Sequence, residues 1–136
     1  MLRKWMAERS LMLGRLSLGA WLALIVIGSL IPGSLIPEAA GPIGAVLFHR
    51  ADKVAHGVAY AVLCLLLIWG TAPLRWQTRL IGSAVGATVF GALIEVLQPL
   101  TGRSCNLADA GLNALGVLAA LLAIALAGRL RRPRTA

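Results

Sequence analysis

The sequence predicts an all-α membrane protein whose four helices cross the bilayer alternately up and down. Apolar residues make up 59% of the 136 residues, against roughly 45–50% in soluble domains. Four long apolar runs fill most of the chain, as expected of membrane-spanning helices. Basic residues gather in alternate connections between these runs, as the positive-inside rule expects of cytoplasmic segments. These three observations favour a compact four-helix transmembrane bundle over a water-soluble fold.

The basic residues also indicate the orientation of the chain. Ten of the thirteen Lys and Arg residues lie in the N-terminal segment, around Arg75 and Arg79, or in the C-terminal tail. We therefore predict a cytoplasmic basic segment over residues 1–15, a four-span domain over 16–126 and a cytoplasmic basic tail over 127–136. The net charge of +8 does not indicate nucleic-acid binding, because no stacking aromatics accompany the tail. Anionic lipid headgroups are the better partner for it.

The ends of the spans are inferred from turn-forming residues and from the lengths of the apolar runs. The first span runs from about residue 16 to 36, is expected to end or kink at Pro32, and is followed by a loop over 37–50. A cleaved signal peptide is disfavoured, because no convincing small-residue cleavage site closes the run. The other spans are predicted over residues 54–69, 80–97 and 107–126.

Small residues in the third span predict close helix packing. Gly82 and Gly86 are one turn apart, a spacing that lets two helix backbones approach closely. We interpret the pair as a packing seam within the bundle in preference to a dimer contact. Assembly into a homo- or hetero-oligomer stays open.

Polar side chains gather where the second, third and fourth spans meet the predicted outer face. A charged side chain costs roughly 2.5–3.5 kcal/mol at the bilayer centre and less near the interface, so its presence there indicates a role. The candidates are Asp52, Lys53, His56, Tyr60, Glu95, Gln98, Arg103, Asp109 and Asn113. Because they fall at one depth, we predict a shared polar site.

On the second span, Asp52, His56 and Tyr60 recur every four residues and therefore share one helix face. Asp52 also suits a helix N-cap, and Lys53 could simply reach the interface. A histidine one turn inside an apolar helix needs a partner, and imidazole titrates near neutral pH. We favour proton transfer or ligand binding by His56 over a purely structural role.

Glu95 is the strongest single candidate. It lies near the C-terminus of the third span, where the helix dipole disfavours a carboxylate. An acid at that depth must be paired, protonated or in contact with a ligand. We favour a functional role, with an ion pair to Lys53 or Arg103 as the alternative. Gln98 follows on the same side of the helix.

The segment before the fourth span supplies further polar groups. Asn106 and Asp109 have the spacing of an N-cap and the third helical residue, as in a capping box. Asn113 extends this face by one turn, where an amide commonly bonds another helix. Arg103 suits a carboxylate or a phosphate.

Three segments, DKVAHGVAY, IEVLQ and GRSCNLADAGLNALG, resemble the VanZ-like family of small membrane proteins in their order and spacing. The run SLIPGSLIP also resembles the end of the family's first span. The resemblance implies a multi-pass protein of the bacterial plasma membrane; the family is named after a member linked to resistance to the glycopeptide teicoplanin. The family's polar motif falls on the nine candidates above and on Gly116. The Cys105–Asn106 pair departs from the family pattern.

Two functions of different kinds fit these residues. The first is an enzyme acting on a lipid-linked or cell-envelope component, in which His56 and Glu95 share acid–base catalysis and Asp109 orients a partner. Substrate binding would then fall to Asp52, Lys53, Tyr60, Gln98, Arg103 and Asn113. The second is a non-catalytic protein that binds an envelope lipid or partner and alters the access of glycopeptide-type antibiotics.

Other chemistries have less support. We expect no cofactor, and a metal held by the carboxylates and histidine of the cluster is a minor alternative, because their spacing matches no recognised ligand motif. Ser104 lacks the surroundings of a catalytic serine, and nothing indicates a reactive thiol at Cys105. Cys64 and Cys105 fall at different depths, so we expect no disulfide. A proton path is disfavoured because no charged residue continues it through the inner half of the spans.

Overall fold

The computed structural model describes residues 1–32 and 41–130, and the side chains of 1–32 and 51–130. Within these residues all regular secondary structure is helical. Its elements are α1 (Leu2–Leu30), α2 (Gly41–Gly70), α3 (Trp76–Leu97), the short 3-10 helix η2 (Gln98–Thr101) and α4 (Leu107–Leu130). Four helices are long and apolar enough to cross a membrane. The predicted all-α class with four candidate spans is confirmed, and it indicates a multi-pass membrane protein.

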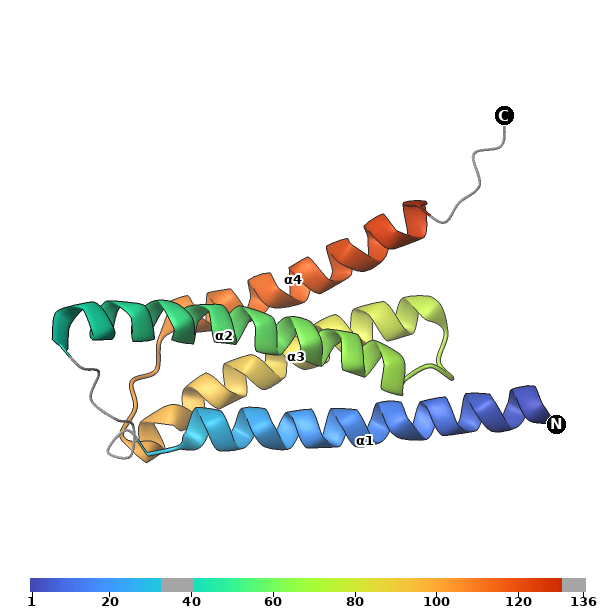
Figure 1. Cartoon of the computed structure of the whole chain (residues 1–136), viewed down its shortest axis with the longest axis horizontal. Coiled ribbons are helices and arrows are strands. Elements are labelled where there is room, and N and C mark those ends of the chain that lie inside the picture. Colours follow the sequence, from blue (N-terminus) through green and yellow to red (C-terminus); the bar gives the residue numbers. More distant parts are fainter. Residues whose placement is uncertain (33–40, 131–136) are drawn as a thin grey trace.

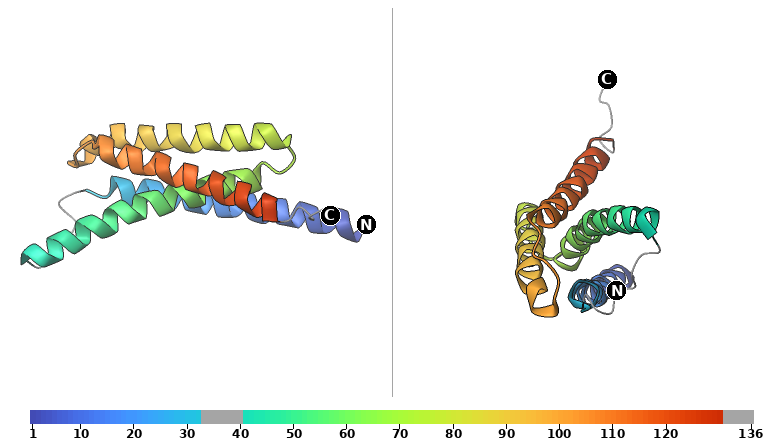
Figure 2. Two further views of the ribbon diagram at one scale, coloured as in Figure 1. Left: turned by 90° about the horizontal axis from the view of Figure 1, so that it is seen from above. Right: turned by 90° about the vertical axis from the view of Figure 1, so that its left-hand side faces the viewer.

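The second helix organises the packing. α2 contacts α1, α3 and α4, and successive long helices run in opposite directions (Figure 1). Leu63 and Cys64 on α2 and Ala87 on α3 are fully buried in the core. α4 diverges from α3 towards its C-terminal end (Figures 1 and 2). The α3–α4 pair is therefore closed at the end where α3 passes into α4 and open at the other (Figure 2).

The first helix starts earlier than predicted and ends just before Pro32, where the sequence predicts an end or a kink. It begins at Leu2, so the basic N-terminal segment continues directly into the first span. The helix stops at Leu30 because Ile31, with ψ 126°, precedes Pro32, and a residue before proline is forced out of the helical region. The remainder of the predicted span, residues 33–36, lies outside the described residues.

The predicted loop over residues 37–50 is wrong for its second part. Residues 41–50 are helical and form the start of α2. Pro42 lies in the first turn, where proline's fixed φ and missing N–H group are compatible with a helix. No further proline follows it before the predicted span, and α2 continues without interruption to Gly70.

Glycines do allow close packing, but not at the predicted pair. Gly82 and Gly86 are exposed, and a Cβ on Gly82 would meet nothing within 4 Å, so the predicted seam within the bundle is wrong. The close contact instead joins α4 to α2, where a Cβ on Gly116 would overlap the backbone of Gly57. On α3, a Cβ on Gly91 would lie 2.9 Å from a ring carbon of Tyr60. These two glycines bring α2, α3 and α4 together beside the polar residues.

Arginines anchor the other end of α2. The Arg79 guanidinium donates to the Ile68 carbonyl oxygen at 2.7 and 3.1 Å, and Arg15 Nε donates to the Gly70 carbonyl oxygen at 3.4 Å. The last carbonyls of a helix lack partners within the helix and carry partial negative charge. Part of the basic charge at this end of the molecule therefore stabilises the fold directly.

Candidate functional site

The polar site lies where α3 ends and α4 begins, beside the middle of α2 (Figure 1). Tyr60 and Asn113 are only 2% exposed, and Glu95 and Gln98 only 3%. The other predicted residues are partly buried: Asp52, Lys53, His56, Arg103 and Asp109. Polar side chains from three helices thus come together at one site, as the sequence predicted.

His56 links α2 to Glu95. Its Nδ1 lies 2.9 Å from the Asp52 carbonyl oxygen. Because a carbonyl oxygen only accepts hydrogen bonds, Nδ1 donates, and the lone pair of the neutral ring lies on Nε2. Nε2 lies 3.8 Å from Glu95 Oε1, within the range of an ion pair once the imidazole takes a proton. The arrangement places a proton acceptor and a carboxylate face to face.

Asp52 does not cap a helix. It lies well inside α2, which begins at Gly41, so the N-cap interpretation is wrong. Its carboxylate instead lies 3.9 Å from His56 Nδ1 and 3.9 Å from Arg103 Nη2. Asp52 therefore lies at an interior position of α2, and its side chain faces the polar site.

Glu95 is held by the start of α4. Its Oε2 accepts a hydrogen bond from the Asn106 backbone N–H at 3.3 Å. The Asn106 side chain accepts one from the Ala108 N–H at 3.0 Å, which confirms Asn106 as an N-cap. In a capping box Asp109 would bond the Asn106 N–H, and here Glu95 takes that place. The positive end of the α4 dipole thus offsets the unfavourable position of Glu95 at the end of α3.

Arg103 ties the site to α1. Besides facing Asp52, its Nη1 donates to the carbonyl oxygens of Gly28 and Ser29 at 3.4 and 3.5 Å. The predicted alternative of an ion pair between Glu95 and Arg103 or Lys53 is wrong for the described part of the chain, where the basic side chain within ion-pair distance of Glu95 is His56.

Several buried polar atoms at the site have no hydrogen-bond partner among the described residues. They are Tyr60 Oη, Glu95 Oε1, Asp109 Oδ1 and both amide atoms of Asn113. A buried polar atom without a partner costs on the order of 1–3 kcal/mol. Such a group of donors and acceptors is suited to bind a polar ligand that completes their hydrogen bonds.

A cavity of about 300 Å³ opens between α1 and α2, and of these residues Tyr60 lines it. Trp21, Leu24 and Ile25 on α1 form its apolar part, and Trp21 Nε1 donates to the Ala59 carbonyl oxygen of α2 at 2.9 Å. The polar part is formed by Ser29, Asp52, His56, Tyr60 and Arg103. The cavity is amphiphilic and leads from an apolar helix face to the His56 imidazole.

The structure also assembles a possible metal site. Asp52, His56 and Asp109 each offer one ligand atom, and these atoms lie within 4.8 Å of one another. Oxygen and imidazole ligands of this kind can hold a divalent cation. A metal held by Asp52, His56, Glu95 and Asp109 is the minor alternative predicted from the sequence, and the structure brings three of these four residues together. Ligand spacing gave this alternative little weight because its members come from separate helices.

The remaining candidate residues make few side-chain contacts at the polar site. The backbone oxygen of Gln98 accepts from Arg103 N–H at 3.3 Å, so Gln98 shapes the turn that carries Arg103. Lys53 is partly buried and forms no ion pair within the described residues. Ser104 is exposed; Cys105 is exposed, Cys64 is buried, and both thiols are free, as predicted.

Comparisons with protein-family models, with curated proteins and with solved structures found no match for this chain. The evidence for a function therefore comes from the geometry of the site and from the local sequence resemblance. The α1 wall of the cavity is the part that sequence reasoning missed. Its residues are apolar or small, and nothing in the sequence distinguishes them from side chains that face lipid.

Proposed function

We propose that the chain is a VanZ-like protein of the bacterial plasma membrane that acts on a lipid-linked or cell-envelope component by acid–base catalysis. In this proposal His56 Nε2 takes a proton from the substrate, and the facing Glu95 carboxylate stabilises the imidazolium and exchanges the proton. Asp109, with a buried oxygen free to bind, positions the reacting group. The observation that carries the proposal is the 3.8 Å approach of Nε2 to Glu95 Oε1 beside an amphiphilic cavity.

The cavity supports an amphiphilic substrate. Its apolar part lies along α1, where an acyl or polyprenyl chain would pack against Trp21 and Leu24. Its polar part contains the Arg103 guanidinium, which favours a phosphate or carboxylate headgroup. A lipid-linked molecule would place its headgroup beside His56 while its chain stays in the apolar part.

The membrane topology belongs to the same proposal. The N-terminus, the connection between α2 and α3 and the C-terminal end of α4 lie towards one end of the molecule (Figure 1), and these segments carry most of the basic residues. Under the positive-inside rule that end is cytoplasmic. The helices then run up-down-up-down with both termini inside, and the polar site faces the outer leaflet.

The test compares envelope lipids and lipid-linked precursors by mass spectrometry in four strains. They carry a deletion, the restored wild type, Glu95→Gln or the matched control Glu8→Gln, an exposed acid on α1. Glutamine keeps an oxygen to accept from the Asn106 N–H but removes the carboxylate charge. We expect a lipid species that changes on deletion, returns with wild type and Glu8→Gln, and stays changed with Glu95→Gln. A normal profile with Glu95→Gln would contradict acid–base catalysis.

A second candidate function is binding without turnover. The unpartnered amide of Asn113 and hydroxyl of Tyr60 favour it, because neither group moves protons readily near neutral pH while both can bind a headgroup. Such a protein would sequester an envelope lipid or partner and alter the access of glycopeptide-type antibiotics. An unchanged lipid profile in the deletion strain, together with an altered glycopeptide response that Glu95→Gln leaves intact, would support it over the enzyme.

A further inference from the structure

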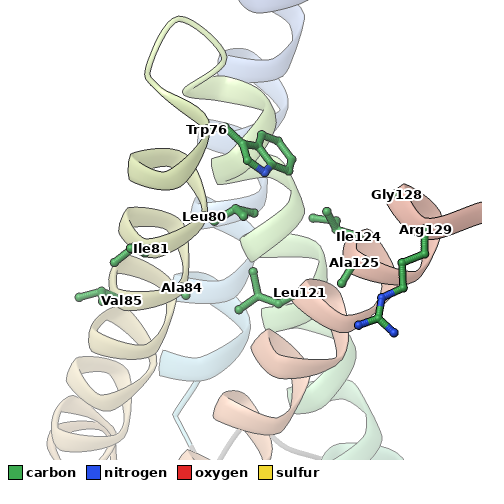
Figure 3. A pocket seen from close by; sticks show the side chains of 10 residues that line it. All are labelled: Trp76, Leu80, Ile81, Ala84, Val85, Leu121, Ile124, Ala125, Gly128 and Arg129. Carbon is green, nitrogen blue, oxygen red and sulfur yellow. The ribbon is translucent and has the colours of Figure 1, made fainter. Parts of the chain in front are cut away.

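A second and larger cavity, of about 720 Å³, opens between α3 and α4 at the end of the bundle opposite the polar site. Figure 3 shows Leu80 and Ala84 of α3 facing Leu121, Ile124 and Ala125 of α4 across it. The two helices diverge here (Figure 1). We call this cavity the α3–α4 groove.

The length of the groove matches one membrane leaflet. It runs along α3 from Trp76 to Val85, nine residue steps or about 14 Å at roughly 1.5 Å per residue. Half of a bilayer's hydrocarbon core is about 15 Å thick. Ala84 and Ala125 leave width between the helices, so a single acyl chain fits the apolar part.

The end of the groove farthest from the polar site carries a positive charge. Arg129, in the last turn of α4, and Trp76, at the start of α3, line it there. Arginine and tryptophan are typical of the depth of lipid headgroups. Arg129 forms no ion pair or hydrogen bond with the described side chains. Residues 53–94 and 110–136 contain no acid, so neither wall offers Arg129 a counter-charge.

We propose that the α3–α4 groove is a binding site for one anionic phospholipid, with an acyl chain between the two helices and the headgroup phosphate on Arg129. The site shares no residue with the polar cavity and does not depend on the function proposed for it. Charge complementarity selects the anionic class, because a zwitterionic lipid would fill the apolar part equally well but bring no net charge to Arg129.

The test measures lipid binding to the purified full-length protein by native mass spectrometry. Phosphatidylglycerol and phosphatidylethanolamine with identical acyl chains are titrated against the wild type, Arg129→Gln and the control Arg3→Gln, which removes the same charge from an exposed site on α1. We expect phosphatidylglycerol to bind in one tight site. Arg129→Gln should lower the affinity for phosphatidylglycerol roughly fivefold, the effect of about one interfacial charge. Arg3→Gln should bind phosphatidylglycerol as the wild type does, and the affinity for phosphatidylethanolamine should be the same in all three proteins.

A groove-filling variant tests the apolar part independently. Ala125→Phe places a ring between the helices and should weaken the binding of both lipids. Equal affinity of the wild type for the two lipids, or an equal loss with Arg3→Gln, would overturn the proposal. A wild-type protein that is a dimer, together with an Ala125→Phe variant that is a monomer, would also overturn the proposal, because a second copy of the chain would then occupy the groove.

Discussion

Replacing Gly116 with alanine should destabilise the protein by forcing α4 away from α2. The new Cβ would overlap the Gly57 carbonyl oxygen and lie 2.9 Å from its carbonyl carbon and 3.1 Å from the Ala61 amide nitrogen. These are backbone atoms of a hydrogen-bonded helix, so no side-chain rotation relieves the contact and the helices must separate. Overpacking of this kind costs about 1–3 kcal/mol.

Gly111→Ala on the same helix is the matched control, because its Cβ would meet nothing within 4 Å. Both variants gain the same helix propensity, up to about 1 kcal/mol, so their difference isolates the contact with α2. Thermal unfolding in detergent, followed by circular dichroism, should give Gly116→Ala a Tm roughly 4–12 °C below that of Gly111→Ala. Equal Tm values would refute the close approach of α2 and α4 at this glycine.

Two further predictions concern the start of α4. Asn106→Ala removes the side-chain bond to the Ala108 N–H and should lower stability by about 0.5–2 kcal/mol, while Asn106→Ser should retain most of it in the same thermal assay. Cys105 is exposed and Cys64 buried, so a membrane-impermeant maleimide should label only Cys105 on intact spheroplasts. Labelling of Cys105 only after permeabilisation would reverse the proposed orientation.

The location of the polar site could be predicted because a membrane penalises the burial of charge. Asp52, His56 and Glu95 are conspicuous in an apolar sequence, and helical periodicity alone placed the first two on one face. The structure confirms that they meet. The partner of each could not be predicted, because Arg103 and Asn106 reach the site through a turn whose path the sequence does not determine.

Helix packing was harder to predict than the site. The spacing of Gly82 and Gly86 is typical of close contacts, yet both are exposed, whereas Gly116 and Gly91 make the contacts. In a soluble protein a buried face is marked by apolar residues. In a membrane span both faces are apolar, so spacing shows that two glycines share a face but not which face meets another helix.

Glu95 joins two helix ends with opposite electrostatic requirements. The end of α3, two residues further on, disfavours its charge, whereas the first N–H groups of α4 favour it. η2 and Gly102, which adopts the left-handed φ of 75°, reverse the chain between these ends, so that Asn106 N–H reaches Oε2.

One oxygen of this carboxylate therefore maintains the fold, while the other faces His56 at 3.8 Å. Alanine at position 95 would remove both contributions together. Glutamine keeps an acceptor for Asn106 and removes the charge that His56 faces. For this reason the proposed acid–base role of Glu95 can be separated from its structural role by a single substitution.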